Sequence, residues 1–382
     1  MSRPRLLFYC QHLLGIGHIS RSLALCRALA DRFDVTYLQG GPDIGRTLDH
    51  PAFDHVFLPP LLMREHDSTL YDPAGAHSVE TLWQMRQDAV APVLDEPYDA
   101  VVIELFPFGR NKFKREILGI IDAARQKNPA VQVFCSNRDI MVQKNDQAAR
   151  EEKILRVLES HFDYLLVHTD PALIPMEATF AATPRIADKI RYTGYVADGV
   201  GPAAASAPAR GPGILVSLGG GAVGDELALA AIAVADAFPE HPMTVLTGPY
   251  TTDAGRKAFQ EAAAGKPGVT IKGFSEDFRA DLAAARLSIS LAGYNTLMDL
   301  LATRTPALVY PYMANIEQNM RATALQDLGL VGIVTKDMLA PDRLIAAIRA
   351  RLDAPPAAQT IDLSGAESTA AIIEQAVATA RP

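Results

Sequence analysis

The sequence predicts an α/β protein with two doubly wound parallel sheets, one in each of two domains. Short apolar runs typical of buried strands alternate with segments of helical periodicity, which is the pattern of a mostly parallel sheet covered by helices on both faces. Residues 198–213, rich in Ala, Pro and Gly, interrupt this alternation, which then begins again. A chain of 382 residues is long enough for two such domains, each with its own core.

The order of strands and helices sets the expected domain boundaries. We expect a first domain over residues 1–200, a second over 213–364 and a final helix within 365–382, after the break at Pro355-Pro356. The first domain has expected strands at 5–10, 35–38, 55–58, 100–103, 131–135, 164–167 and 190–192 and its clearest helices at 79–94, 113–126 and 147–160. The second has expected strands at 214–218, 244–246, 269–271, 287–291, 307–310 and 332–334.

The bulk composition excludes several classes of protein. With 49% apolar residues and 21% charged residues, the chain has the composition of a soluble globular protein, and its net charge of −8 argues against a broad surface that binds nucleic acid. Its three cysteines are far apart and form no Cys-x-x-Cys motif, so we expect a reducing, cytoplasmic environment, with Cys10 and Cys135 as small core residues. No apolar run approaches the ~18 residues of a membrane span.

The first expected strand runs into a glycine turn, Leu14-Gly15-Ile16-Gly17-His18, and then into a helix with apolar residues at a spacing close to 3.6. Such a turn directs free backbone N–H groups toward an anion. A histidine at a helix N-terminus has its pKa lowered by the helix dipole, which favours the neutral form that can accept a proton. His18 is therefore a candidate general base, and the alternative is a histidine that only caps the turn.

A second glycine run, Gly219 to Gly221, closes the first strand of the second domain and opens a helix. Glycines allow close approach of the backbone to a diphosphate, and the helix N-terminus favours its charge. The alternative is a tight turn without a ligand.

Residues 287–321 form the most informative stretch, with the expected order strand, turn, helix, strand, loop and helix. We expect Asn295 or Thr296 to cap the helix that carries Asp299. Polar side chains follow both strand ends, and ligands of open α/β sheets bind at that carboxyl edge. This stretch therefore predicts a pocket for a hydroxyl-rich ligand such as a ribose or hexose, formed by residues Asn295, Thr296, Asp299, Asn315, Glu317, Gln318 and Arg321.

These motifs resemble the donor-binding half of GT-B glycosyltransferases of the MurG-like, family 28 type. The resemblance implies two Rossmann-like domains that face a cleft, with the final helix returning to the first. Gly293-x-x-Thr296-x-x-Asp299 stands where the family has Gly-x-x-Thr-x-x-Glu, so Asp299, one methylene shorter, would hold the ribose hydroxyls. Glu317 and Gln318, with Arg321, would contact the donor sugar. The glycine run 219–221 would bind the diphosphate and Phe274 the base, unless Phe274 is a core residue at a strand end.

The N-terminal turn resembles the same family. Gly15-x-Gly17-His18-x-x-Arg21 is similar to the first loop of MurG-like transferases and still more similar to that of nucleotide-sugar hydrolases of the pseudaminic acid pathway, whose histidine is catalytic. Residues that follow other strand ends in this domain would face the acceptor: Glu104, Arg110, Asn137 and Arg138. Basic residues crowd the helix start near Lys114, which indicates an anionic ligand or membrane surface, or else a solvated basic face.

The resemblance implies an inverting, metal-independent transferase that uses a nucleotide-sugar, with UDP as the nucleotide, an unidentified hydroxyl acceptor and no further cofactor. Hydrolysis of the donor by water is the first alternative, and 2-epimerisation, which needs further carboxylates, is the second. A dinucleotide dehydrogenase or a plain binding module is the third, although the turn lacks the third glycine of the dinucleotide fingerprint. His161, His168 and Asp170 fit no metal-ligand spacing, so we expect no metal. We expect a cytoplasmic protein, with a peripheral place at the inner membrane face as an alternative.

Overall fold

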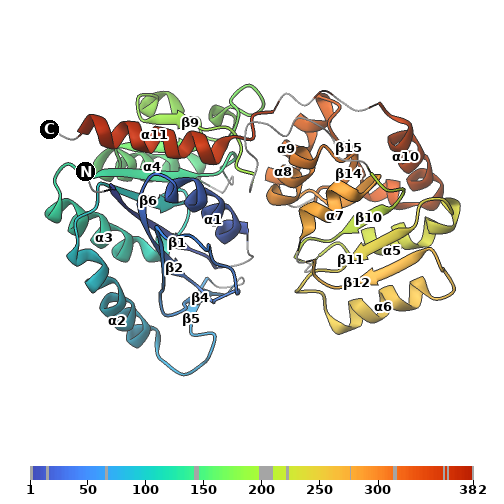
Figure 1. Ribbon diagram of the computed structural model, residues 1–382, viewed down its shortest axis with the longest axis horizontal. Helices are drawn as coiled ribbons and strands as arrows, with labels where there is room; N and C mark the ends of the chain where they lie inside the picture. The colour runs from blue at the N-terminus through green and yellow to red at the C-terminus, as the bar shows by residue number, and fades with distance from the viewer. Residues whose placement is uncertain are drawn as a thin grey trace. The chain divides into compact units, whose positions relative to one another are not determined.

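The computed structural model describes residues 3–13, 17–64, 68–141, 146–197, 210–220, 223–275, 277–312, 316–355, 358 and 361–380. It divides into two compact units. The first unit comprises Met1–Gly201 with Asp362–Pro382, and the second comprises Pro202–Ile361. In Figure 1 each unit is a twisted sheet with helices on both faces, so the predicted fold class is confirmed.

The first unit contains a seven-stranded sheet with the order β3-β2-β1-β6-β7-β8-β9. All neighbouring strands run parallel. Strand order reverses between β1 and β6. After β1 the chain adds β2 and β3 toward one edge of the sheet, and after β6 it adds β7, β8 and β9 toward the other edge. The strands are β1 (Arg5–Gln11), β2 (Asp34–Gly40), β3 (Phe53–Phe57), β6 (Ala100–Glu104), β7 (Gln132–Asn137), β8 (Tyr164–Val167) and β9 (Ile190–Tyr192).

Both faces of this sheet are buried, which explains why its strands are continuous apolar runs. Alternate residues of β1 enter different cores: Phe8 and Cys10 pack with α1 (Gly17–Ala30) and α11 (Gly365–Ala380), whereas Leu7 packs with the helices of the opposite face. The opposite face is covered by α2 (Val79–Val90), α3 (Lys114–Lys127) and α4 (Gln147–His161). The expectation that Cys10 and Cys135 are core residues is confirmed, since neither is exposed to solvent.

The final helix, α11, completes the first unit. Ala370 and Ile373 are fully buried in the same core as β1 and α1. At its start the backbone is so close to the preceding segment that a Cβ on Gly365 would lie 2.5 Å from the Gly194 carbonyl oxygen. The chain therefore leaves the first unit once and returns to it at Asp362.

Two local features of the first unit differ from the sequence prediction. The helix expected over 79–94 ends at Val90 and continues as a 3-10 turn, Ala91–Asp95, because Pro92 has no N–H and its ring would clash with the preceding turn. A two-stranded antiparallel hairpin, β4 (Leu62–Met63) with β5 (Leu70–Tyr71), was not predicted. Strands of two residues are too short to show an alternating pattern.

The second unit contains a six-stranded parallel sheet with the order β12-β11-β10-β13-β14-β15. Figure 1 shows α5, α6 and α10 on one face and α7, α8 and α9 on the other. Strand order reverses between β10 and β13. The strands are β10 (Ile214–Ser217), β11 (Met243–Leu246), β12 (Val269–Lys272), β13 (Leu287–Leu291), β14 (Ala307–Tyr310) and β15 (Gly332–Ile333). The helices are α5 (Asp225–Val234), α6 (Asp253–Ala263), α7 (Phe278–Ala284), α8 (Tyr294–Thr303), α9 (Ile316–Asp327) and α10 (Pro341–Asp353).

None of the helices within the described ranges is both long and apolar enough to cross a membrane.

Candidate functional site

Each sheet has a topological switch point. This is the position between two neighbouring strands from which the chain adds later strands toward opposite edges of the sheet. In open α/β sheets, ligands bind at the carboxyl ends of the strands at such a point, because the loops there diverge and leave a crevice. The first unit has its switch point between β1 and β6, and the second between β10 and β13. The residues that follow β1 and β6 are therefore the candidate site of the first unit, and those that follow β10 and β13 are the candidate site of the second.

A histidine and a glutamate meet at the switch point of the first unit. His18 is the second residue of α1, which follows β1, and Glu104 is the last residue of β6. The Nδ1 atom of His18 lies 2.7 Å from Oε1 of Glu104. The same carboxylate oxygen accepts a hydrogen bond from Arg21, which lies three residues after His18 on α1. The His18 side chain is 17% exposed, whereas Glu104 is fully buried.

Burial decides the protonation of this pair. Loss of hydration lowers the pKa of His18 to about 4, although the nearby Glu104 carboxylate acts in the opposite direction. Burial alone would raise the pKa of Glu104, but the contact with His18 and the charges of Arg21 and Arg110 lower it to about 2. Near neutral pH the imidazole is therefore neutral and the carboxylate is charged. The predicted direction for His18 agrees, but burial is the largest cause.

The carboxylate also fixes the tautomer of the imidazole. A charged Glu104 can only accept, so Nδ1 carries the proton and donates it to Oε1. Nε2 then keeps a lone pair and can accept a proton from a hydroxyl group or water. The sequence analysis placed Glu104 on the acceptor side and did not pair it with His18. The two residues are 86 positions apart, and only the pairing of β1 with β6 brings them together.

The other candidates of the first unit surround this pair. Gly17 opens α1, whereas Gly15 lies outside the described residues. Arg110 adopts a left-handed conformation, with φ 61°, and its Nε donates a hydrogen bond to the Gln11 carbonyl at the end of β1. The charge of Arg110 therefore acts on His18 and Glu104 while its backbone turns the chain into the 3-10 turn before α3.

Two further candidates follow β7. Asn137 is the last residue of that strand and is buried, and Arg138 follows it and is half-buried. Leu105, directly after Glu104, has φ 64°, a conformation that a branched side chain rarely adopts. Such backbone strain is found at functional sites, where the surrounding structure holds it in place.

The glycine turn after β10 is the first half of the site in the second unit. Gly219 has φ +57°, and apart from its chain neighbours no atom of the described residues lies within 4 Å of the position where a Cβ would be. A Cβ on Gly220 would lie 3.3 Å from the Tyr250 ring, whose backbone N–H donates to the Gly220 carbonyl at 2.8 Å. The turn is thus open on one side and supported on the other. Gly221 lies outside the described residues.

The helix that follows this turn differs from the expectation in one respect. The first turn of α5 carries two carboxylates, Asp225 and Glu226, which themselves interact favourably with the positive end of the helix dipole. A diphosphate at this edge would therefore depend on the open backbone of the glycine turn more than on the dipole of α5.

Helix α8 holds the second half of this site. Gly293 is its N-cap residue, in an extended conformation, and no side chain of the described residues caps the helix. The prediction that Asn295 or Thr296 is the cap is therefore wrong, because the helix already begins at Tyr294 and both residues lie in its first turn. Asp299 lies in the second turn, and its carboxylate is 3.7 Å from the Arg279 guanidinium of α7. This contact places a cation beside the carboxylate.

Helix α9 presents a buried charged face. Glu317 and Arg321 are both buried and lie four residues apart, and the Arg321 guanidinium lies over the Tyr294 ring at 5.1 Å from its centre. The Gln318 side-chain oxygen accepts the Tyr312 N–H at 2.9 Å, so it stabilises the turn before α9. An amide oxygen can accept two hydrogen bonds, so this bond does not by itself exclude the expected contact of Gln318 with a sugar. Asn315 lies outside the described residues.

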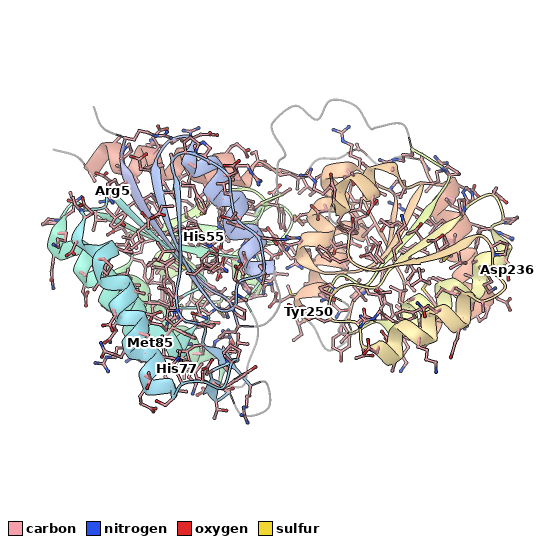
Figure 2. The ribbon with its side chains drawn as sticks, turned by 60° about the horizontal axis from the view of Figure 1, so that its bottom comes forward. Arg5, His55, His77, Met85, Asp236 and Tyr250 are labelled. Carbon is pink, nitrogen blue, oxygen red and sulfur yellow. The ribbon has the colours of Figure 1, made fainter. Side chains whose placement is uncertain are left out.

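Exposed aromatic rings surround the same edge. Tyr250, Phe274 and Tyr312 follow β11, β12 and β14 and are 52%, 52% and 45% exposed. Figure 2 shows Tyr250 at one end of the second unit and Asp236, which precedes β11, at the opposite end. Phe274 is thus not a core residue, and that alternative is wrong. The sequence analysis missed Tyr250 and Tyr312, whose only signal is a single aromatic residue in a loop after a strand.

His168 is a satisfied core residue. It is fully buried on the first unit, and its two ring nitrogens lie 2.8 Å from the Ser136 hydroxyl and 2.9 Å from the Thr193 hydroxyl. Both nitrogens of His168 therefore have hydrogen-bond partners within the core.

Comparison with known proteins supports the resemblance noted in the sequence. Residues 216–376 match the glycosyltransferase family 28 C-terminal domain. A UDP-N-acetylglucosamine--N-acetylmuramyl-(pentapeptide) pyrophosphoryl-undecaprenol N-acetylglucosamine transferase from Gloeobacter violaceus is 35% identical over 109 residues, which are 28% of this chain and 30% of that protein. The matched region spans less than a third of the length of such curated relatives.

Solved structures show the same fold over nearly the whole chain. The crystal structure of Medicago truncatula UGT71G1, complexed with UDP-glucose, has a TM-score of 0.63 at 12% identity and covers 99% of this chain and 98% of its own. The crystal structure of Acinetobacter baumannii MurG has a TM-score of 0.53 at 16% identity and covers 97% and 100%. The chain therefore has the fold of GT-B glycosyltransferases, and its residues 216–376 are similar to the glycosyltransferase family 28 C-terminal domain.

Proposed function

We propose that this protein is an inverting, metal-independent glycosyltransferase that moves a sugar from a UDP-sugar to a hydroxyl group of an acceptor. The observation that carries the proposal is the 2.7 Å contact of His18 with Glu104 at the switch point of the first unit. It supplies a neutral, correctly protonated imidazole where a GT-B protein would bind an acceptor. The family 28 match of the second unit supports a nucleotide-sugar donor.

The proposed reaction is a single displacement. Nε2 of His18 takes the proton of the acceptor hydroxyl as its oxygen attacks the anomeric carbon of the sugar. The bond from that carbon to the diphosphate oxygen breaks, and the electron pair leaves with the nucleoside diphosphate. Glu104 stabilises the imidazolium that forms, and the proton passes later to solvent. Attack from the face opposite the leaving group inverts the anomeric configuration.

The second unit would bind the donor and stabilise the leaving group. The open backbone at Gly219 and Gly220 would receive the diphosphate, and Asp299 would hold the ribose hydroxyls. Glu317 and Arg321, fixed in the buried face of α9, would position the sugar, with help from the Gln318 amide. The exposed rings at the same edge would stack on the base and the sugar.

One experiment tests the class of reaction. Purified protein is screened by thermal shift against UDP-, GDP- and dTDP-sugars, and the stabilising donor is then incubated with candidate acceptors. Proton NMR of the product shows whether the anomeric configuration is inverted. Stabilisation by a UDP-sugar and an inverted product support the proposal, whereas retention of configuration would overturn the single displacement.

Hydrolysis is the second candidate, because the same base can accept a proton from water and the Gly15-x-Gly17-His18-x-x-Arg21 motif is similar to that of nucleotide-sugar hydrolases. Incubation of the donor alone separates the two reactions: release of free sugar and UDP in equal amounts at catalytic rates identifies a hydrolase. Deuterium incorporation at C2 of the sugar would identify an epimerase. Saturable NAD(P)H binding without UDP binding would identify a dinucleotide enzyme.

The acceptor is proposed to carry an anionic group or to lie at a membrane surface. A cavity of about 270 Å³ between α3 and α4 is lined by Lys114, Lys153, Arg156, Val157 and His161. The first three are exposed cations, and within the described part of the chain no acidic side chain lines the cavity with them. Cosedimentation with vesicles that contain anionic lipid, and not with neutral vesicles, would support a peripheral membrane location at the cytoplasmic face. If the protein stays in the supernatant with both kinds of vesicle, the result would favour a soluble anionic acceptor.

A further inference from the structure

The second unit has another cavity at the opposite edge of its sheet. This cavity, of about 240 Å³, is bordered by residues that precede strands: Arg286 before β13, Pro306 before β14 and Val331 before β15. Its floor is formed by apolar side chains, among them Leu300, Leu301, Leu330 and Leu352. Because the glycine turn and Asp299 lie toward the carboxyl edge, the cavity is separate from the donor site.

Four arginines surround this apolar floor: Arg210, Arg286, Arg304 and Arg351. In the part of the chain that the structure describes, none of the four forms an ion pair with a carboxylate. Burial and the neighbouring Arg286 charge lower the pKa of Arg210, and burial lowers the pKa of Arg351. Four like charges without a counter-charge destabilise the unliganded cavity.

Two of the arginines have structural roles. The Arg210 guanidinium donates to the Thr303 and Arg304 carbonyls, each at 2.8 Å, and so caps the C-terminal end of α8. Arg351 donates to the Gly329 and Leu330 carbonyls after α9. However, the Nε of Arg351 is buried and has no hydrogen-bond partner among the residues that the structure describes, although a buried donor normally has one.

The other two arginines are exposed at the rim. Arg286 makes a single long contact, 3.4 Å, with the Leu352 carbonyl. Arg304 adopts a left-handed conformation at the end of α8, with φ 53°, and its side chain has no hydrogen-bond or ion-pair partner among the described residues. These two guanidinium groups can therefore both turn toward one ligand without loss of an existing ion pair.

We propose that this cavity binds the phosphate group of a phosphorylated amphiphile, whose apolar part lies on the leucine floor. The guanidinium groups of Arg286 and Arg304 can each donate two hydrogen bonds to a pair of phosphate oxygens. Their positive charges balance the negative charge of the phosphate. The volume is below the range of pockets that hold drug-sized ligands, roughly 300–1,000 Å³, so a whole nucleotide-sugar does not fit. A free alkyl phosphate and a lipid headgroup share the required chemistry.

Calorimetry on the full chain tests the proposal, with hexyl phosphate, inorganic phosphate and hexanol as probes and UDP present at saturation to occupy the donor site. We expect hexyl phosphate to bind, and to bind more tightly than inorganic phosphate because only the former covers the apolar floor. The double variant R286Q/R304Q should weaken binding by about tenfold or more. The control R349Q removes one exposed charge from α10 outside this cavity and should change affinity less than about twofold.

Other outcomes would overturn the proposal. Three results would each show that the proposed phosphate site does not exist: absence of hexyl phosphate binding, loss of that binding when UDP is added, or the same affinity for hexyl phosphate in R286Q/R304Q as in the wild type. Equal affinity for inorganic phosphate would overturn the amphiphilic part of the proposal. Vesicles of phosphatidylcholine with and without phosphatidic acid then distinguish the source, because R286Q/R304Q lowers vesicle binding only if a lipid headgroup enters the cavity. The readouts measure binding alone, so they do not depend on the proposed transferase activity.

Discussion

The two units have the same topology at their switch points, but different kinds of residue follow the strands there. At the first, a half-buried histidine converges with a buried glutamate and a buried arginine where β1 and β6 end. At the second, the strand ends of β10 and β13 lead into glycines, and exposed aromatic rings surround them. The fold thus determines where a ligand is bound, and the residues after each strand determine whether the point is suited to proton transfer or to recognition.

Removal of the imidazole should have the largest effect. His18→Ala should reduce kcat by about 10² or more, since a general base contributes on that scale. The Kd for UDP, measured by calorimetry, should remain within about twofold because donor binding belongs to the second unit. A variant with unchanged kcat would show that the first switch point is not the site of proton transfer.

Glu104→Gln sharpens the same comparison. The amide cannot stabilise an imidazolium as a carboxylate does, so kcat should fall at least about tenfold, with the KM for the donor unchanged. Glu104 now raises the pKa of His18, so its loss should move the acid limb of the kcat/KM profile further below pH 4. Thermal unfolding of the variant is the control, because Arg21 also loses its charged partner. A fall in kcat without any movement of the acid limb would favour a purely structural role.

Acid should destabilise the first unit selectively. Burial lowers the pKa of His18 to about 4 and that of His168 to about 3, so below pH 6.5 the unfolded chain binds protons that the folded unit does not. The stability contributed by these neutral groups is complete above pH 6.5 and is lost as pH falls toward 4. At pH 5 each histidine should cost about 2 kcal/mol.

The single tryptophan provides the measurement. Trp83 lies in α2 of the first unit, so its fluorescence during urea unfolding follows that unit alone. Its midpoint should fall clearly between pH 7 and pH 5. A midpoint that does not move would contradict the neutral state of both histidines, and His168→Gln separates their contributions.

Changes at the second switch point should affect binding rather than turnover. Asp299→Asn should weaken UDP binding by about tenfold, the scale of a hydrogen bond to a charged group, with kcat at saturating donor nearly unchanged. Arg279→Gln is the matched control, since it removes the partner of Asp299 without the expected ligand contact. If calorimetry finds wild-type affinity for UDP in Asp299→Asn, Asp299 does not bind the ribose.

The smallest effect is expected at the glycine turn. Gly219→Ala meets no neighbouring atom but must adopt φ +57°, which costs about 1 kcal/mol in an L-residue. UDP affinity should fall severalfold, and Gly265→Ala, another open glycine with φ +78° in the same unit, should leave it unchanged. Equal effects of the two changes on UDP affinity would show that the turn has no special role.

Much of this fold could be predicted, because buried parallel strands are continuous apolar runs. The strand at 5–10 and the helix at 365–380 are found within one residue of the expected positions. What could not be predicted depends on neighbours in space. The pairing of His18 with Glu104 requires the contact of β1 with β6, and the burial of Glu317 requires the packing of α9. Helix caps depend on a single backbone conformation, as at Gly293.

The position of α11 has a consequence for the order in which the protein folds during synthesis. The second unit is one continuous segment, Pro202–Ile361, and all of its core residues leave the ribosome before the final helix does. The first unit begins earlier but keeps Phe8 and its neighbours uncovered until Ala370 and Ile373 have been made. The first unit is thus the last to complete its core. Until then its exposed apolar surface is the part of the chain that most needs protection by chaperones.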